Sequence, residues 1–428
     1  MLLLRSGGAW RLPRVLAPGV WIADAAGITD AFERRLGTPT WFLRQLSYRE
    51  DEHTGRLRAV LELELVEAGW TPPAHGRWVA REELDRVRLK DEEQRPLLVE
   101  HLGELAARDE VPPQRPPWAR PGWRDRVHEW LESEVARLGH RFDRVEQRKQ
   151  WGISAVLRVH TDGPLLYLKV PARLPLFVEE GRVTAALAQR FPGYVPAPLT
   201  VEPDEGWFLL PDLGDPVGWD APFETRAAML RRFGSLQRRS AAITDELLAA
   251  GCLDRRLDVL FGQLDDLIAD PAATARLARE ETIELQQRWP ELKDACRRLA
   301  GLGLPDTLVH GDLHLGNVAR CDGELVYFDW TDACIAHPFT DLHTLQWERD
   351  EEVRAALLDA YLAEWEGAIP PERLREAAAL ASVVIPLHHA VSYQHIVANL
   401  EPASKVELDG THGFLREALE KLRGMADP

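Results

Sequence analysis

The stretch "LVHGDLHLGN" at residues 308–317 holds two histidines, one aspartate and one asparagine behind two apolar residues. Asp312 precedes Asn317 by five positions. A turn that caps a helix explains one polar residue in such a place, but not a set at fixed intervals. The alternative is a loop that brings a carboxylate and an amide oxygen together for chemistry, and the residues that follow favour it.

The next segment, "NVARCDGELVYFDW" at 317–330, has the pattern of a β-hairpin. An Asp-Gly pair between two apolar runs is the strongest short-range signal for a two-residue turn. Pairing about this turn places Asn317 opposite Phe328, one step from Asp329. Because Cβ atoms of facing strand residues lie about 5 Å apart, we expect Asn317 and Asp329 to converge at the open end, with Asp312 just upstream.

These three residues match the needs of phosphoryl transfer. Asn317 and Asp329 offer oxygen ligands, which suit Mg²⁺ because this ion takes few protein ligands and completes its shell with water and phosphate. Asp312 is then left to act as the base for an attacking hydroxyl. In protein kinases, too, the base aspartate of the catalytic loop precedes a metal-binding asparagine by about five residues, and a second metal-binding aspartate follows later.

Three motifs in this order, "HGDLHLGN", "VYFDW" and "HPFTDL", resemble the aminoglycoside phosphotransferase family, also called the phosphotransferase enzyme family. The resemblance extends over roughly residues 123–428. It implies ATP or GTP as phosphate donor, Mg²⁺ as cofactor and a small-molecule acceptor. It also implies that Asp341 accepts hydrogen bonds from the backbone of the catalytic loop. We expect His310 to pack and shape this loop, whereas His314 either supports the site or contacts the acceptor.

A lysine on a strand of the small lobe is expected to bind the α- and β-phosphates. "PLLYLKV" at 164–170 supplies Lys169 among apolar neighbours. The following segment, 178–191, has helical periodicity, and Glu180 lies on its inward edge, where it could pair with Lys169. Glu179 is the competing choice, and an acidic first turn favoured by the helix dipole is a further explanation.

The hinge between the lobes should be an extended apolar segment that offers backbone groups to a purine. "GWFLLPDLG" at 206–214 fits this description, although a core strand would show the same pattern. The residues expected to line the nucleotide are Phe208, Leu209, Leu210, Pro211 and Asp212. The phosphate loop departs from protein kinases, because "RKQWGIS" at 148–154 has one glycine and no GxGxxG.

The sequence predicts an α+β, bilobal protein-kinase-like fold. A helix at 123–139 and three strand-like segments, "VEQRKQ", "AVLRVH" and "PLLYLKV", indicate a small β-rich N-lobe over residues 123–214. A large helical C-lobe over 215–428 should carry the catalytic loop and the acceptor site. From Phe223 onward we expect helices, interrupted only by the β segment at 317–330.

Residues 1–110 are predicted to form a separate small α+β domain. Strand-like "TWFLRQLSY" and "LRAVLELELVEA" flank the turn "DEHTG", and helical "REELDRVRL" and "RPLLVEHLGELAAR" follow. Prolines make 111–122 an extended linker. The domain faintly resembles a Nudix-like fold without the paired glutamates of the Nudix box. Hydrolysis is therefore not expected, which leaves the roles of a cap, a dimerisation surface or a ligand sensor.

The composition limits the possible partners. Net charge is −17, and residues 301–428, with 22 Asp and Glu against 9 Lys and Arg, carry −13 of it. This charge argues against nucleic acid and anionic membranes as partners. A cytoplasmic location is predicted, because no run approaches the about eighteen apolar residues of a membrane span. Four widely spaced cysteines indicate reduced thiols rather than a zinc site or disulfides. The oligomeric state stays open.

The acidic C-terminal part predicts a cationic acceptor, aminoglycoside-like or an amino alcohol, because carboxylates attract ammonium groups in a cleft. A neutral sugar stays possible. Polar residues at 387–410 either line the acceptor pocket or form a solvated face. They are His388, His389, Tyr393, Gln394, His395, Glu401, Glu407 and Asp409.

The predicted function is a small-molecule kinase that transfers the γ-phosphate of ATP or GTP to a hydroxyl. A metabolic kinase for a sugar or an amino alcohol is the alternative within the same fold. A nucleotide-binding regulator with little turnover is a third hypothesis. The presence of Asp312 beside Asn317, Asp329 and Lys169 argues against the regulator, because a protein that only binds nucleotide needs no base.

Overall fold

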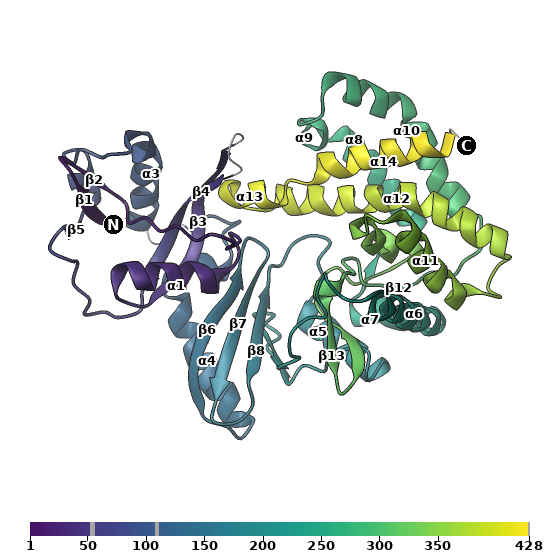
Figure 1. Ribbon diagram of the computed structural model, residues 1–428, viewed down its shortest axis with the longest axis horizontal. Helices are drawn as coiled ribbons and strands as arrows, with labels where there is room; N and C mark the ends of the chain where they lie inside the picture. The colour runs from purple at the N-terminus through teal and green to yellow at the C-terminus, as the bar shows by residue number, and fades with distance from the viewer. Residues whose placement is uncertain (52–55, 108–110, 427–428) are drawn as a thin grey trace. The chain divides into compact units, whose positions relative to one another are not determined.

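The computed structural model describes residues 1–51, 56–107 and 111–426 (Figure 1). The chain divides into two compact units. Unit 1 consists of Met1–Ala172 and Leu400–Glu407, and unit 2 of Arg173–Asn399 and Leu408–Pro428. Short 3-10 helices occur in both units, at η1 (Glu92–Gln94), η2 (Pro117–Ala119), η3 (Ala241–Ile243), η4 (Leu315–Asn317), η5 (Pro338–Trp347) and η6 (Ala363–Trp365).

In the first part of unit 1, the described residues 1–51 and 56–107 form two small antiparallel sheets and three α-helices. One sheet has the order β2-β1-β5, and the other is a hairpin of β3 and β4. The strands are β1 (Leu2–Ser6), β2 (Ala9–Arg11), β3 (Thr40–Asp51), β4 (Arg56–Leu65) and β5 (Gly76–Trp78), and the helices are α1 (Ala25–Leu36), α2 (Arg81–Leu84) and α3 (Arg95–Ala106). The predicted strands are confirmed. Of the predicted turn "DEHTG" at 51–55, Asp51 ends β3 and the remaining residues, 52–55, lie outside the described residues.

The predicted helix "REELDRVRL" is wrong beyond its first four residues, because α2 ends at Leu84. The guanidinium of Arg95 donates hydrogen bonds to the carbonyls of Leu84 and Val87, both at 2.7 Å. These carbonyls would otherwise accept from the next helical turn, so the side chain of Arg95 ends the helix. The second predicted helix is confirmed as α3.

The second part of unit 1 pairs α4 (Trp123–Arg137) with the antiparallel strands β6 (Phe142–Gln150), β7 (Ser154–Thr161) and β8 (Leu166–Pro171). The predicted helix at 123–139 is confirmed, and it buries residues spaced four apart, as one helical face requires. They are Trp123, Val127, Leu131 and Val135. Gly139 follows this helix with φ of 86°, a left-handed conformation that ends helices.

Residues 1–110 and the strands after α4 are joined by buried side chains. Phe42 donates its backbone N–H to Gln147 Oε1 at 2.8 Å, and Gln147 Nε2 donates back to the Phe42 carbonyl at 2.7 Å. Gln150 Nε2 donates to the carbonyls of Phe42 and Leu43. The glutamine side chains thus satisfy backbone groups of β3, and the domain boundary at 111–122 stays a prediction.

The segment Leu400–Glu407, which contains most of α13 (Pro402–Leu408), also belongs to unit 1. Arg115 Nε donates to the buried Glu401 carboxylate at 2.8 Å, and Arg115 and Arg44 each contact Glu104 at 2.8 Å. Arg115 of the predicted linker and Glu401 of the segment Leu400–Glu407 therefore belong to one cluster of charged side chains.

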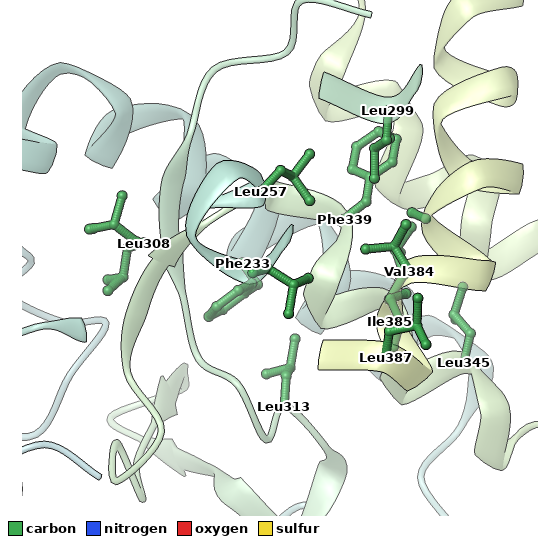
Figure 2. Packing of buried hydrophobic residues seen from close by; sticks show 14 of the residues in the cluster. Phe233, Leu257, Leu299, Leu308, Leu313, Phe339, Leu345, Val384, Ile385 and Leu387 are labelled. Atoms are coloured by element: carbon green, nitrogen blue, oxygen red, sulfur yellow. The ribbon is translucent and has the colours of Figure 1, made fainter. Parts of the chain in front are cut away.

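Unit 2 is mainly helical, and its core joins helices that are far apart in sequence. Phe233, Phe339 and Val384, labelled in Figure 2, come from α6, η5 and α12, and all belong to one buried cluster. The long α12 packs against α14 and α10 (Figure 1). The helices are α5 (Glu180–Arg190), α6 (Phe223–Ser240), α7 (Thr244–Ala250), α8 (Leu257–Ala269), α9 (Pro271–Thr274), α10 (Arg279–Ala300), α11 (Glu351–Leu362), α12 (Pro371–Ala398) and α14 (Thr411–Ala426).

The prediction of a single β segment after Phe223 is wrong. Besides the expected hairpin of β13 (Val318–Cys321) and β14 (Glu324–Tyr327), unit 2 has a sheet of order β11-β15-β12. These strands, β11 (Leu253–Asp254), β12 (Thr307–Val309) and β15 (Cys334–Ala336), have only two or three residues. Alternation needs at least four residues to be visible in a sequence, so such strands leave no pattern. Unit 2 also contains the antiparallel pair β9 (Thr200–Val201) and β10 (Phe208–Pro211).

The predicted α+β composition is confirmed, with a β-rich N-terminal part and a helical C-terminal part. No helix within the described ranges is long and apolar enough to cross a membrane.

Candidate active site

The hairpin β13–β14 sets the positions of Asn317, which comes directly before β13, and of Asp329, which follows β14. Its register joins Val318 to Tyr327, and the turn residue Asp322 has φ of 52° before a glycine with φ of 84°. Both positive φ values are those of a type I′ turn. Phe328 N donates to the Asn317 carbonyl at 3.0 Å, which confirms the predicted facing of these two residues.

The predicted catalytic loop, residues 310–317, is held together by its own polar groups. The amide nitrogen of Asn317 donates to the Asp312 carbonyl at 2.9 Å and lies 3.3 Å from Asp312 Oδ2. The two residues predicted to be base and metal ligand are therefore in direct contact. Because the amide nitrogen is used in this way, Asn317 Oδ1 points away from Asp312. The Asp312 side chain is 52% exposed, so a substrate can reach it.

Gly311 is required by the path of this loop. Its φ is 83°, and a Cβ at this position would lie 2.6 Å from the Cβ of Asp332 and 2.7 Å from its carbonyl oxygen. Only glycine combines this conformation with so close an approach. The loop is thereby packed directly against the segment that follows Asp329.

Asp341, in the first turn of η5, binds the backbone of the loop at 310–317. Its carboxylate accepts from the backbone N–H of His310 at 2.9 Å and of Gly311 at 3.0 Å, and Gln237 Nε2 lies 3.2 Å away. These are the contacts expected of it. Burial raises the pKa of Asp341 to about 7, although the two backbone donors oppose this shift.

His310 links the loop to the hairpin and is fully buried. Its Nε2 lies 2.9 Å from the Phe328 carbonyl, and its Nδ1 accepts from Asp312 N at 3.3 Å. This pairing places the ring proton on Nε2 of a neutral imidazole, and burial lowers the pKa of His310. The centroid of its ring also lies 4.6 Å from that of the Trp330 ring. These contacts suit a residue that shapes the loop.

His314 lies beside the base. Its Nδ1 accepts from Gly316 N at 3.0 Å, which leaves the proton on Nε2, 3.5 Å from Asp312 Oδ2. Its ring stacks on Trp219 with centroids 5.2 Å apart. The contact with Asp312 favours a supporting role, while the partly exposed ring keeps contact with the acceptor open.

Asp329 has an unusual backbone, with φ of 68°. Aspartate tolerates this left-handed region better than most residues, and such conformations concentrate at functional sites. Its Oδ1 lies 3.1 Å from the hydroxyl of Thr331, which donates to the buried carboxylate of Glu180 at 2.8 Å. Thr331 was not singled out from the sequence, because its partner Glu180 is remote along the chain.

The residues present fit Mg²⁺. Asn317 Oδ1 and the Asp329 carboxylate are hard oxygen donors at the open end of one hairpin, and Mg²⁺ binds through one or two carboxylates, water and phosphate. Across residues 1–51, 56–107 and 111–426, no group of three or more His, Cys, Asp or Glu side chains is arranged to hold a metal ion.

Lys169 and Glu180, which are predicted to belong to the nucleotide site, lie on the expected elements. Lys169 is on β8 in unit 1, opposite Val156. Glu180 is 2% exposed in the first turn of α5, whereas Glu179 has an exposed side chain near Arg173, so the inward position belongs to Glu180. Because Lys169 and Glu180 fall in different units, their pairing stays a prediction.

The predicted hinge forms β10, with Phe208 and Leu209 buried and Leu210 and Pro211 half-buried. Asp212 is exposed, and its Oδ1 accepts from Gly214 N at 3.0 Å. Contact of these residues with a purine stays a prediction.

The polar residues at 387–410 do not form one surface. His388 and His389 are buried within α12, and burial lowers their pKa values well below the usual range, so they are not part of a solvated face. Glu401 lies in unit 1 and pairs with Arg115, whereas Gln394 bonds Asp270 in unit 2. The side chain of Glu407 lies outside the described residues.

A predicted base and two predicted oxygen ligands on one loop and hairpin are the arrangement expected of a phosphotransferase site. Residues 149–377, more than half of the chain, match the model of the Phosphotransferase enzyme family. The protein belongs to this family, and it is a phosphotransferase that acts on an alcohol group.

Solved structures are similar in fold. A choline kinase from Streptococcus pneumoniae is 13% identical over 70% of this chain and 99% of its own, with a TM-score of 0.50. The macrolide 2′-phosphotransferase of Brachybacterium faecium is 22% identical over 66% of this chain and 97% of its own, with a TM-score of 0.48. The predicted protein-kinase-like fold is confirmed. Among curated proteins, none matches the chain.

Proposed function

We propose that this protein is a kinase that transfers the γ-phosphate of ATP or GTP to a hydroxyl of a cationic small molecule. The observation that carries the proposal is the direct contact between Asp312 and Asn317 at the open end of the hairpin that leads to Asp329. It sets the predicted base beside one predicted metal ligand, on the hairpin that leads to the second, and phosphoryl transfer requires both kinds of group.

Asp312 orients and deprotonates the acceptor hydroxyl. Both of its polar neighbours, Asn317 Nδ2 and His314 Nε2, reach Oδ2. Within the part of the chain that the structure describes, Oδ1 has no hydrogen-bond partner. We assign Oδ1 as the atom that takes the proton, while the donors on Oδ2 keep the carboxylate turned toward the acceptor.

Asn317 and Asp329 would hold Mg²⁺, which when bound neutralises charge on the nucleotide phosphates. Asn317 is kept in place for this role by Asp312. Lys169 would bind the α- and β-phosphates, and Glu180 would steady Lys169.

Two exposed tryptophans support a cationic acceptor. Trp219 and Trp347 are 53% and 54% exposed, their ring centroids lie 5.5 Å apart, and Trp219 stacks on His314 next to Asp312. A tryptophan face attracts an ammonium group, and the C-terminal part of the chain, residues 301–428, is acidic. An aminoglycoside-like compound or an amino alcohol has the ammonium and hydroxyl groups that this arrangement would bind.

The same tryptophans favour a second candidate. A sugar ring has an apolar face that stacks on an indole, so a metabolic sugar kinase would use Trp219 and Trp347 without any cation. The two candidates share the roles of Asp312, Asn317 and Asp329 and differ only in the acceptor.

The test is nucleotide consumption by the full-length protein with Mg²⁺ and a panel of aminoglycosides, amino alcohols and neutral sugars. The proposal expects acceptor-dependent ADP or GDP formation with an ammonium-bearing alcohol and none with its neutral analogue. Turnover with neutral sugars alone would favour the second candidate. Tight nucleotide binding without acceptor-dependent turnover would favour a nucleotide-binding regulator.

A further inference from the structure

Thr331 connects two carboxylates to which the proposed function gives different tasks. Its hydroxyl lies 2.8 Å from Glu180 Oε2 and 3.1 Å from Asp329 Oδ1. Thr331 and Glu180 are 7% and 2% exposed, so water screens their contact only weakly. The hydroxyl therefore joins the predicted metal ligand to the predicted partner of Lys169.

The backbone of Thr331 strengthens this connection. Its carbonyl accepts from Val178 N at 3.0 Å, just before α5 begins at Glu180. The start of the helix is also confined by β10, because a Cβ on Gly181 would lie 3.0 Å from the Cβ of Phe208. The first turn of α5 is thus fixed between β10 and the segment that contains Asp329.

The properties of a threonine hydroxyl determine how Thr331 can bind the two carboxylates. Threonine is β-branched and stiff at χ1, so Oγ1 is held at one position. A hydroxyl has one proton to donate, which it can give to either carboxylate by rotation about the Cβ–Oγ1 bond. Donation to Asp329 Oδ1 would fix the orientation in which this carboxylate meets a cation, while the contact with Glu180 Oε2 fixes the hydroxyl itself.

We propose that Thr331 is a positioning residue that holds the Asp329 carboxylate for the metal and couples it to Glu180. This inference rests on the proposed function, in which Asp329 is a metal ligand. Groups that orient metal ligands typically change metal affinity by about 10- to 100-fold when they are removed. Thr331 should therefore set how much Mg²⁺ the protein needs for nucleotide binding.

The experiment is calorimetry of ATP binding to the full-length protein at a series of Mg²⁺ concentrations. Thr331→Val keeps the shape of the side chain and removes the hydroxyl, and it should raise the half-saturating Mg²⁺ concentration about tenfold. Thr331→Ser keeps the hydroxyl and should restore most of the affinity. ATP binding in the absence of Mg²⁺ should be nearly unchanged in both variants.

Thr184→Val is the matched control. Thr184 lies one turn along α5 from Glu180, is 2% exposed, and its hydroxyl has no hydrogen-bond partner among the described residues. The same substitution there should leave the Mg²⁺ requirement as it is. If Thr331→Val does not fold, Thr331→Ala and Thr331→Ser give the same comparison, and an equal Mg²⁺ requirement for these two would overturn the inference.

Asp329→Ala separates the inference from the proposed function. A wild-type Mg²⁺ requirement in Thr331→Val, together with loss of Mg²⁺-dependent binding in Asp329→Ala, contradicts the role of Thr331 and leaves the metal site standing. Unchanged Mg²⁺-dependent binding in Asp329→Ala contradicts the metal site itself, and with it the proposed function.

Discussion

Asp341 and His310 hold the loop that presents Asp312. The carboxylate of Asp341 accepts two backbone N–H groups of the loop, and the ring of His310 connects the loop to the hairpin at Phe328. At the scale of single residues, the geometry of the site therefore depends on buried polar contacts whose donors and acceptors are matched. Replacing a buried hydrogen-bond acceptor by a donor of the same size should therefore disturb the site more than shortening a side chain elsewhere in the protein.

Asp341→Asn tests this dependence. The amide nitrogen would face the N–H of His310 or Gly311, donor against donor. An unsatisfied buried polar group costs about 1–3 kcal/mol, so we expect a lower free energy of unfolding and a fall in kcat. Denaturant unfolding and steady-state kinetics measure the two effects. Asp350→Asn is the control, because Asp350 caps α11 and asparagine caps helices equally well. Wild-type stability and kcat in Asp341→Asn would show that the contact is dispensable.

At the scale of elements, what the sequence predicts well is local. The hairpin was predicted with its pairing because an Asp-Gly turn and two apolar runs are enough to specify it. The three-stranded sheet of unit 2 was missed, because its strands are very short and pair across long distances. The contact of Thr331 with Glu180 was missed for the same reason, since 151 positions separate the two residues.

The 3-10 helix η5 gives a pH-dependent prediction. Its N-cap residue His337 is 3% exposed and accepts from Phe339 N at 3.2 Å, and burial lowers its pKa to about 3. The unfolded chain binds a proton at this residue below its ordinary pKa of about 6.5. The folded state does not do so until about pH 3, so stability is lost as pH falls through this window.

His337→Asn keeps a cap acceptor and removes the titrating group. One proton corresponds to about 1.4 kcal/mol per pH unit. Between about pH 6 and pH 4, the free energy of unfolding of the variant should therefore fall less steeply than that of the wild type, by up to this amount. Denaturant titrations at several pH values measure both slopes. Equal slopes would show that His337 is protonated in the folded protein as readily as in the unfolded chain.

At the scale of the whole molecule, residues 1–110 contribute buried contacts to unit 1. The proline-rich stretch predicts an independent domain, but unit 1 has buried contacts across it. Gln147 and Gln150 bond the backbone of Phe42 and Leu43, and Arg115 pairs with Glu104. A cut at the linker would replace these intramolecular hydrogen bonds by bonds to water, and each such bond contributes about 0.5–1.5 kcal/mol to stability.

We therefore expect the fragment 111–428 to unfold at a lower denaturant concentration than the full chain. The reason is the loss of the bonds from Gln147 and Gln150 to the backbone of β3 and of the Arg115–Glu104 pair. Equilibrium denaturation of both proteins measures the difference. A fragment as stable as the full chain would instead establish residues 1–110 as a separate domain, as the linker predicts.

The most direct test of the account is Asp312→Asn in the full-length protein with an acceptor that supports turnover. The substitution keeps the shape of the side chain and removes the base, whose loss typically lowers the rate by about 10²–10⁴. Nucleotide affinity should change little, because the predicted metal ligands are other residues. Asp322→Asn, in the hairpin turn where asparagine is favoured, is the control and should keep its kcat. A collapse of kcat with unaltered ATP binding is the predicted result. An Asp312→Asn variant that keeps more than about a tenth of the wild-type kcat would contradict the assignment of Asp312 as the base.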